Sequence, residues 1–261
     1  MLPDFHLIQH HFPDREDIKI YPISDVHFGA AEHMTREWEL FCQRVVDEPN
    51  SYIILGGDLI NNGTKTSVTN CYAETWRPRE QKRIITEMLA PLASKTLCTV
   101  SGNHERRNRD CDNDITYDIM CKLNIEERYR ENIAFVKIQM GELGNKRNGM
   151  KNPTYVIAVT HGAGGGMVGA SANRGNRFAL CIDGVDLMIF GHNHHPFVQQ
   201  SSKIKVDPFN NKVTLRPFKV VSMTSWLGWG GYAAQKMLAP TGFAPQTITL
   251  CGTKKDIKVE M

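Results

Sequence analysis

The stretch Thr96-Leu97-Cys98-Thr99-Val100-Ser101-Gly102-Asn103-His104-Glu105 runs from apolar residues directly into a polar cluster. Its first five residues predict a short strand, which Ser101-Gly102 ends. Asn103, His104 and Glu105 then lie in the loop after the strand. The chain therefore places an amide, an imidazole and a carboxylate together at the end of one strand.

Four more polar segments follow apolar runs in the same way. They are Asp25-Val26-His27, Gly57-Asp58, His161-Gly162 and Gly191-His192-Asn193-His194. As strand followed by loop, the five segments bring seven potential metal ligands to the same edge of one sheet. Half of the chain's 10 histidines lie in these segments, which a scatter of surface histidines does not explain.

Strands and helices alternate along the chain. Apolar runs predict strands at residues 18–24, 52–55, 96–100 and 186–190, and a long hairpin formed by 133–140 and 155–160. Amphipathic patterns predict helices near residues 34–45, 80–92, 114–123 and 174–182. The last sixty residues are expected to form strand-like pieces separated by Pro, Gly and Asn. This alternation indicates a layered α/β architecture, in which ligands gather at the carboxyl ends of the strands.

Composition narrows the class of protein. The chain has 261 residues, 41% of them hydrophobic, and neither a linker nor an internal repeat divides it. We therefore expect a single domain over residues 1–261 with a sizeable core. A net charge of +3 with 23% charged residues is only mildly basic. It permits a nucleic-acid substrate without indicating one, and it falls short of a dedicated duplex-DNA coat protein.

The sequence also indicates the cellular setting. No apolar run approaches the ~18 residues of a spanning helix, and the N-terminus shows no secretory signal, so we expect no membrane partner. The seven cysteines are an odd number without a Cys-x-x-Cys pair. This pattern favours free thiols in a reducing cytoplasm over a disulfide framework or a cysteine zinc site.

The residue types and spacings suit a pair of divalent cations. Each cation needs about four ligands, and one carboxylate should bridge both. Asp25 and His27, with one residue between them, can face one ion, and Gly57 admits close backbone approach beside a bridging Asp58. Asn103 supplies a neutral oxygen, which keeps the site's charge low enough to accept an anionic phosphate. The His-x-His pair puts two imidazoles on one side of an extended segment.

In this order the five segments resemble the calcineurin-like metallophosphoesterase superfamily, whose pattern is Asp-x-His, Gly-Asp, Gly-Asn-His-Asp/Glu, His and Gly-His-x-His. The likeness spans residues 25–194, about two thirds of the chain. It implies an α/β fold of four layers, an αββα sandwich, with a dinuclear metal site at the strand-end loops. By the same resemblance, one ion would be held by Asp25, His27, Asp58 and His194. The other would be held by Asp58, Asn103, His161 and His192, with Asp58 bridging.

The resemblance also implies a reaction. The two ions would lower the pKa of a bridging water, and the resulting hydroxide would attack phosphorus in line with the departing oxygen. His104 would be catalytic rather than a ligand, and would protonate the leaving group or stabilise its charge. Oxygen and imidazole ligands without thiolate fit manganese, which we favour, and also iron or zinc.

Four residues outside the metal set are candidate substrate contacts: Asn61, Arg106, Asn173 and Arg174. Arg106, with Arg107 and Arg109, could clamp phosphate oxygens, although arginines leading into a helix are more often solvated. Asn61 could bind phosphate or cap a helix. Asn173 and Arg174 end a glycine-rich stretch after His161, which either lines the substrate site or is a simple connector.

The first and second segments differ from those of phosphoprotein phosphatases. The Ser24-Asp25-Val26-His27 form looks more like the DNA-repair exonuclease and small phosphodiesterase branches. The glycine-rich stretch followed by Asn-Arg is similar to compact stand-alone phosphoesterases of phage and prophage genomes. These likenesses favour a phosphodiesterase or nuclease acting on DNA or a nucleotide.

Two other functions stay open. One is a phosphomonoesterase acting on a small metabolite or a phosphoprotein, and the other is a binding scaffold without catalysis. The complete set of ligands and His104 argues against the scaffold. The sequence leaves undecided the natural substrate, the metal, the polarity of a nuclease and whether the protein is a homo-oligomer.

Overall fold

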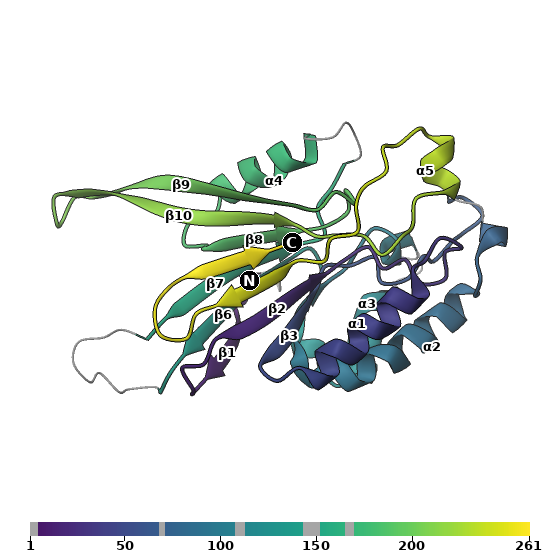
Figure 1. Cartoon of the computed structure of the whole chain (residues 1–261), viewed down its shortest axis with the longest axis horizontal. Coiled ribbons are helices and arrows are strands. Elements are labelled where there is room, and N and C mark those ends of the chain that lie inside the picture. Colours follow the sequence, from purple (N-terminus) through teal and green to yellow (C-terminus); the bar gives the residue numbers. More distant parts are fainter. Residues whose placement is uncertain (1–4, 68–70, 108–112, 143–151, 165–169) are drawn as a thin grey trace.

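The computed structural model describes residues 5–67, 71–107, 113–142, 152–164 and 170–261. Two six-stranded sheets lie face to face within them, and helices cover the outer faces (Figure 1). The order of layers is helix, sheet, sheet, helix. This is the four-layer αββα sandwich that the sequence predicted.

The first sheet is built around parallel strands. Its order is β12 (Ile257–Glu260), β11 (Thr247–Leu250), β2 (Ile18–Ile23), β3 (Ser51–Leu55), β4 (Thr96–Val100) and β5 (Tyr129–Arg130). From β2 to β5 all neighbours are parallel. The carboxyl ends of β2, β3 and β4 therefore share one edge.

The second sheet is mixed. Its order is β1 (Ile8–Phe12), β6 (Ile133–Met140), β7 (Thr154–Thr160), β8 (Leu187–Phe190), β10 (Lys212–Ser222) and β9 (Phe197–Asp207). β6 and β7 pair in antiparallel fashion, as predicted, and the predicted polar tip at 144–149 lies outside the described residues. β7 and β8 are parallel, so their carboxyl ends also share an edge.

Four helices lie where the apolar patterns predicted them, with two shifts: α1 (Thr35–Asp47), α2 (Pro78–Leu89), α3 (Ile115–Lys122) and α4 (Ala170–Leu180). The short α5 (Gly231–Gln235) was not predicted and lies in the last sixty residues, which were expected to form strand-like pieces. The helix expected at 80–92 becomes 3-10 from Ala90 to Lys95, because Pro91 cannot donate an α-helical hydrogen bond. α4 begins four residues before the predicted 174. Three-residue 3-10 turns lie at Cys71–Ala73 and Glu126–Arg128.

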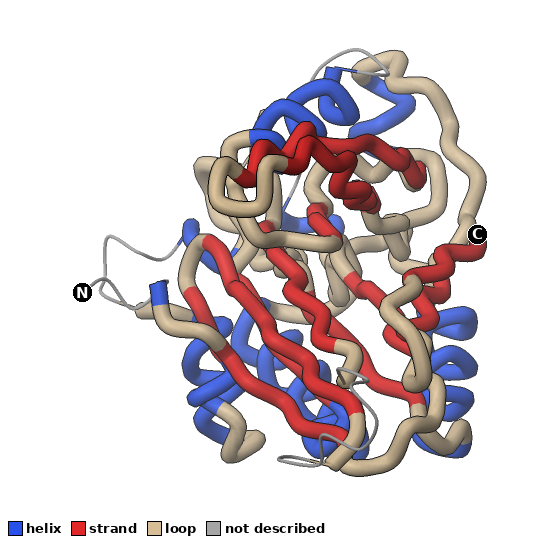
Figure 2. The backbone as a smooth tube through the Cα atoms, turned by 90° about the vertical axis from the view of Figure 1, so that its left-hand side faces the viewer, coloured by secondary structure: helices blue, strands red, loops and turns tan. Residues whose placement is uncertain are grey.

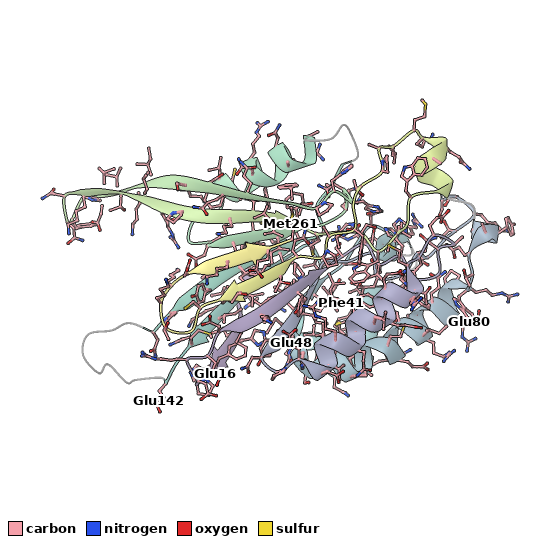
Figure 3. The ribbon with its side chains drawn as sticks, in the orientation of Figure 1. Glu16, Phe41, Glu48, Glu80, Glu142 and Met261 are labelled. Atoms are coloured by element: carbon pink, nitrogen blue, oxygen red, sulfur yellow. The ribbon has the colours of Figure 1, made fainter. Side chains whose placement is uncertain are left out.

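Three apolar clusters hold the layers together. One lies between the sheets and includes Ile20 and Val159. A second lies between the first sheet and α1, α2 and α3. Phe41, which is labelled on α1 in Figure 3, packs there edge-on against Tyr21. The third lies between the second sheet and α4. Figure 2 shows the helices outside the strands, as this distribution of apolar side chains requires.

Membrane crossing has no candidate among these helices. Within the described ranges, none of them combines the length and the apolar character that a bilayer span requires.

Candidate metal centre at the strand ends

All five polar segments lie directly after strands, at the edge where the two sheets meet. They follow β2, β3, β4, β7 and β8 in chain order. Hydrogen bonds between side chains and the main chain join the loops of the two sheets. Asp25 Oδ2 accepts from His192 N at 2.9 Å, and Gly56 O accepts from His161 Nδ1 at 2.8 Å. The fold thus brings the predicted ligands together from positions up to 169 residues apart, Asp25 and His194.

One group of ligand atoms contains Asp25, His27 and His194. The Nε2 atom of His194 lies 3.2 Å from Asp25 Oδ1 and 3.3 Å from His27 Nε2. His27 Nε2 lies 3.9 Å from Asp25 Oδ1. All three ligand atoms are within 4.8 Å of one another, a spacing that one cation could span.

A second group contains Asp58, His161 and His192. His161 Nε2 lies 3.3 Å from Asp58 Oδ2 and 3.2 Å from His192 Nδ1. The Oδ1 atom of Asn103 is 2.9 Å from the same His161 nitrogen. Asn103 therefore adds a neutral oxygen to this group.

Asp58 joins the two groups. Its Oδ2 atom, already near His161, lies 3.8 Å from His27 Nε2 in the first group. The Asp58 carboxylate is buried, so it faces the ligands rather than water. This is the position that a bridging carboxylate needs.

The donor set fits divalent cations. Asp25 Oδ1 is buried and lacks a hydrogen-bond partner, although it points at two imidazoles. Imidazole nitrogens of different residues face one another at 3.2–3.3 Å in both groups, where a cation would satisfy both lone pairs. Oxygen and nitrogen donors without a thiolate suit manganese, iron or zinc.

The pKa shifts of the site residues show that the site favours a positive charge. Burial lowers the pKa of His161, but the nearby carboxylates of Asp58 and Asp25 outweigh this and raise the pKa to about 10. Burial raises the pKa of Asp58, yet the imidazoles of His161 and His104 bring that pKa well below its usual value. In the metal-free protein a proton on the imidazole of His161 thus offsets the negative charge of the carboxylates, and a cation would displace that proton.

The ligand loops hold unusual backbone conformations. Five candidate ligands have positive φ: Asp25 at 53°, His27 at 47°, Asp58 at 52°, His192 at 71° and His194 at 56°. They are half of the ten non-glycine residues with positive φ in the described part of the chain. Residues other than glycine rarely adopt positive φ, and each such residue costs on the order of 1–3 kcal/mol of folding free energy. The fold therefore holds these side chains in place at a cost to its own stability.

Glu105 organises the loop that carries Asp58. It is buried, and its carboxylate accepts from the main-chain nitrogens of Asp58 and Gly102 at 3.0 Å and of Leu59 at 2.6 Å. Burial and the charge of Asp58 raise the pKa of Glu105 to about 7. The motif includes this residue, but sequence reasoning gave it no role; its signal is a carboxylate directly after the catalytic candidate.

Gly57 is required by the same packing. Its φ is 90°, and a Cβ atom there would lie 2.4 Å from Gly102 N. The loop after β3 could not approach the loop after β4 with any other residue at this position. The expected close backbone approach beside Asp58 is thus found.

His104 lies beside the two groups in a fixed orientation. Its Nδ1 donates to Asn61 O at 2.6 Å, and its main-chain nitrogen donates to Asp58 Oδ1 at 2.8 Å. Its Nε2 accepts from Arg107 Nη2 at 2.9 Å. Burial lowers the pKa of His104, so the ring is neutral. His104 Nε2 lies 3.9 Å from Asp58 Oδ2 and could join a third ligand group with His27, but a guanidinium against this nitrogen opposes a cation there.

Arg107, rather than Arg106, is the arginine at the site. Arg107 also donates to Asn61 O at 2.8 Å and to Asn62 O at 3.2 Å, which fixes its guanidinium next to His104. Arg106 instead donates to Ser101 O and Glu131 O. Sequence reasoning named both but chose Arg106, because spacing alone does not tell which of two adjacent arginines turns toward the histidine. Arg109 lies outside the described residues.

The other predicted substrate contacts are less close to the ligands. The side chain of Asn61 donates to Glu74 Oε1 at 2.6 Å, and its main-chain oxygen rather than its amide contacts His104. Asn173 and Arg174 are exposed on α4, and Arg174 donates to Ala163 O in the loop that begins at His161. Their substrate roles stay predictions. Part of the glycine-rich stretch, 165–169, lies outside the described residues.

Solved structures of low sequence identity resemble the chain. A metallophosphoesterase from Sphaerobacter thermophilus is 14% identical, with 94% of this chain and 89% of that chain covered and a TM-score of 0.37. Vps29 from Chaetomium thermophilum is 12% identical, with 93% and 96% covered and a TM-score of 0.43. A predicted phosphoesterase from Streptococcus pneumoniae is 12% identical, with 93% and 88% covered and a TM-score of 0.38. No curated protein matches the chain.

A family comparison is more decisive. The model of the calcineurin-like phosphoesterases matches residues 18–196, which is more than half of the chain and contains all five polar segments. The match begins at the first residue of β2 and ends two residues after His194. The chain therefore belongs to the calcineurin-like phosphoesterase family.

Proposed function

We propose that this member of a family of phosphoester hydrolases is a two-metal phosphodiesterase that acts on a nucleic acid or a nucleotide. The observation that carries the proposal is the pair of ligand groups sharing Asp58, with His104 and Arg107 directly beside them. Manganese is the metal we favour. The Ser-Asp-x-His form of the first segment supports the DNA-repair exonuclease and small phosphodiesterase branches. The glycine-rich stretch followed by Asn-Arg supports the phage-like phosphoesterases.

The charge of the site supports a diester over a monoester. A phosphate monoester carries about two negative charges at neutral pH, whereas a diester carries one. Arg107 is the arginine that hydrogen-bonds to His104. The two cations would offset the carboxylates of Asp25 and Asp58, and Arg107 would add one positive charge, so a diester with one negative charge needs no further cationic side chain. This argument also makes Arg107 the phosphate contact in place of Arg106.

Each part of the site has a role in this proposal. Two cations, when bound, would polarise the phosphoryl group and lower the pKa of a water. His104 keeps its Nδ1 proton on Asn61 O, so Nε2 is the position that can change protonation. It would take up a proton from water when Arg107 turns to the phosphate, and pass that proton to the leaving oxygen. Arg107 donates to that Nε2, and a phosphate oxygen would compete for the same guanidinium. Glu105 holds the Asp58 loop through main-chain nitrogens and contacts no substrate.

A panel of substrates tests the proposal. Purified protein with manganese is assayed against bis-p-nitrophenyl phosphate, p-nitrophenyl phosphate, and labelled single-stranded and double-stranded DNA, with His104→Ala in parallel. We expect diester and DNA cleavage that exceeds monoester cleavage and falls sharply in the variant. Monoester cleavage alone would favour a phosphomonoesterase. Metal binding without any turnover would favour a scaffold.

A further inference from the structure

The β9–β10 hairpin projects past the end of the sandwich (Figure 1). β9 forms the edge of the second sheet, and the two strands pair over their full length, from Phe197 opposite Ser222 to Asp207 opposite Lys212. At about 3.3 Å per residue, the tip lies roughly 30 Å from the metal-site end of β9. The distal half is thus remote from catalysis.

One side of this distal half is apolar. Ile204 pairs with Leu215 and Val206 pairs with Val213, so all four side chains lie on the same side of the hairpin. They are 71%, 72%, 66% and 69% exposed, and Phe209 at the tip is 95% exposed. The alternation continues that of Val198 and Val221, which belong to the core between the sheets. We call these five exposed residues the apolar hairpin face.

The opposite side is basic and anchored. It carries Lys203 and Lys205 on β9, and Arg216 on β10. Lys203 donates to Ile182 O, and Arg216 donates to Gly184 O at 2.9 Å, which ties the hairpin to the segment between α4 and β8. The carboxylate of Asp207 accepts from the main-chain nitrogens of Phe209 and Asn210 and orders the turn. The apolar hairpin face is therefore held in place before any partner binds.

We propose that the apolar hairpin face packs against the same face of a second copy of this chain, as two stacked sheets related by a twofold axis. Five large side chains at these exposures present on the order of 600 Å² of apolar surface, the upper end for the largest patch of a monomer. Two such faces together reach the about 1,200 Å² at which specific interfaces begin. A flat, rigid, two-stranded face is complementary to its own copy.

The distribution of charge favours this arrangement over two others. Stacking leaves Lys203, Lys205 and Arg216 of both copies on the outer sides, away from the contact between the two faces. Pairing of β9 with β9 along its edge would instead align lysines of the two copies on one side, where they repel. Insertion of the apolar side into a bilayer is less favourable, because Lys203 and Arg216 are already held by main-chain carbonyls and are not free to bind anionic headgroups.

Light scattering during size-exclusion chromatography tests the proposal on the full chain. We expect wild-type protein to reach twice the 29.5 kDa of one chain as concentration rises from about 1 to 200 μM, since dimerisation follows mass action. Val206→Glu should raise the dissociation constant about 30-fold or more, the range of an interface hot spot. Thr214→Glu, on the basic side of the same hairpin, should leave it unchanged.

A second variant guards against misfolding. Ile204→Thr keeps a β-branched side chain and should also weaken the dimer while leaving circular dichroism and phosphoesterase turnover unchanged. A wild-type protein that stays monomeric at the highest concentration overturns the proposal, as does equal weakening by Thr214→Glu. A monomer that floats with vesicles of anionic phospholipid overturns it in favour of a lipid surface.

Discussion

The metal-site end of the sandwich and the distal hairpin depart from ordinary protein structure in opposite ways. At the metal-site end, the chain buries three carboxylates and two imidazoles and holds five of the candidate ligands at positive φ. At the hairpin, it exposes five large apolar side chains. Buried charge and exposed apolar surface both cost free energy in an isolated chain.

This contrast indicates that the metal-site end and the distal hairpin suit binding partners of different chemistry. The buried, charged end suits small cations, because Asp25 Oδ1 is buried without a hydrogen-bond partner and imidazole nitrogens face one another in both ligand groups. The exposed, apolar end calls for another apolar surface. The rest of the molecule, with three packed clusters, follows the usual rules. Departures from those rules therefore mark where function resides.

The largest effect should come from Asp58→Asn. Because both ligand groups use this carboxylate, turnover should fall beyond the ~10²–10⁴-fold that loss of a general acid costs. The amide oxygen can still accept from His104 N, but the ionic attraction that raises the pKa of His161 and lowers that of Asp58 is lost. The free energy of unfolding of the metal-free protein should therefore fall at pH 7, and added metal should no longer raise it as in the wild type. Steady-state rates and urea unfolding measure these quantities, and a variant that keeps full turnover or the wild-type gain from metal would contradict the contrast drawn above.

Next in size is His104→Ala. It should lower kcat by about 10²–10⁴-fold while leaving the bound metal unchanged, because His104 contacts Arg107 and Asn61 rather than filling a place in either main ligand group. Metal analysis of the same preparation provides the second readout. His195→Ala is the matched control, since His195 follows the last ligand and its main chain donates to Asn193. Equal losses in the two variants would remove the role of His104.

Two adjacent arginines offer a smaller and sharper test. Arg107→Ala should lower kcat/KM about 10–100-fold, as loss of a charged hydrogen bond costs roughly 1.5–3 kcal/mol. Arg106→Ala should mainly lower the midpoint of thermal unfolding, because its guanidinium holds the carbonyls of Ser101 and Glu131. A loss of kcat/KM in Arg106→Ala, with only a stability loss in Arg107→Ala, would instead support Arg106 as the substrate contact, as the sequence predicted.

The smallest effect concerns His10, which belongs neither to the metal site nor to the distal hairpin. His10 Nε2 donates to Leu97 O at 2.8 Å, and burial lowers the pKa of His10 below its usual 6.5. The unfolded chain therefore binds the proton more readily, so stability is complete above pH 6.5 and declines as pH falls toward the lower pKa of the folded state. A glutamine in place of His10 keeps a hydrogen-bond donor for Leu97 O but does not gain or lose a proton in this pH range. Urea unfolding at pH 7 and pH 5 should show a smaller decline for His10→Gln, and an unchanged decline would exclude this residue as a cause.

Sequence reasoning reached the fold and the convergence of the ligands because both depend on local patterns. Apolar runs define the strands, and parallel strands necessarily share an edge. It chose Arg106 over Arg107 because side-chain direction depends on the turn after Glu105, which spacing does not encode. It gave the β9–β10 region only as strand-like pieces, since the exposure of Ile204 and Val206 depends on how far the hairpin extends beyond its neighbours. Positive φ at five ligands was equally out of reach, because it follows from packing between loops.

Counting the bound metal ions tests the central claim most directly. Metal-free protein is titrated with manganese, and bound metal and the thermal unfolding midpoint are followed together for wild type and Asp58→Asn. We expect two ions per wild-type chain, a stabilisation of about 2.7 kcal/mol for each ion at a hundredfold excess over its dissociation constant, and fewer ions in the variant. A wild-type chain that binds no ion, or a variant that still binds two with the same affinity, would contradict the account.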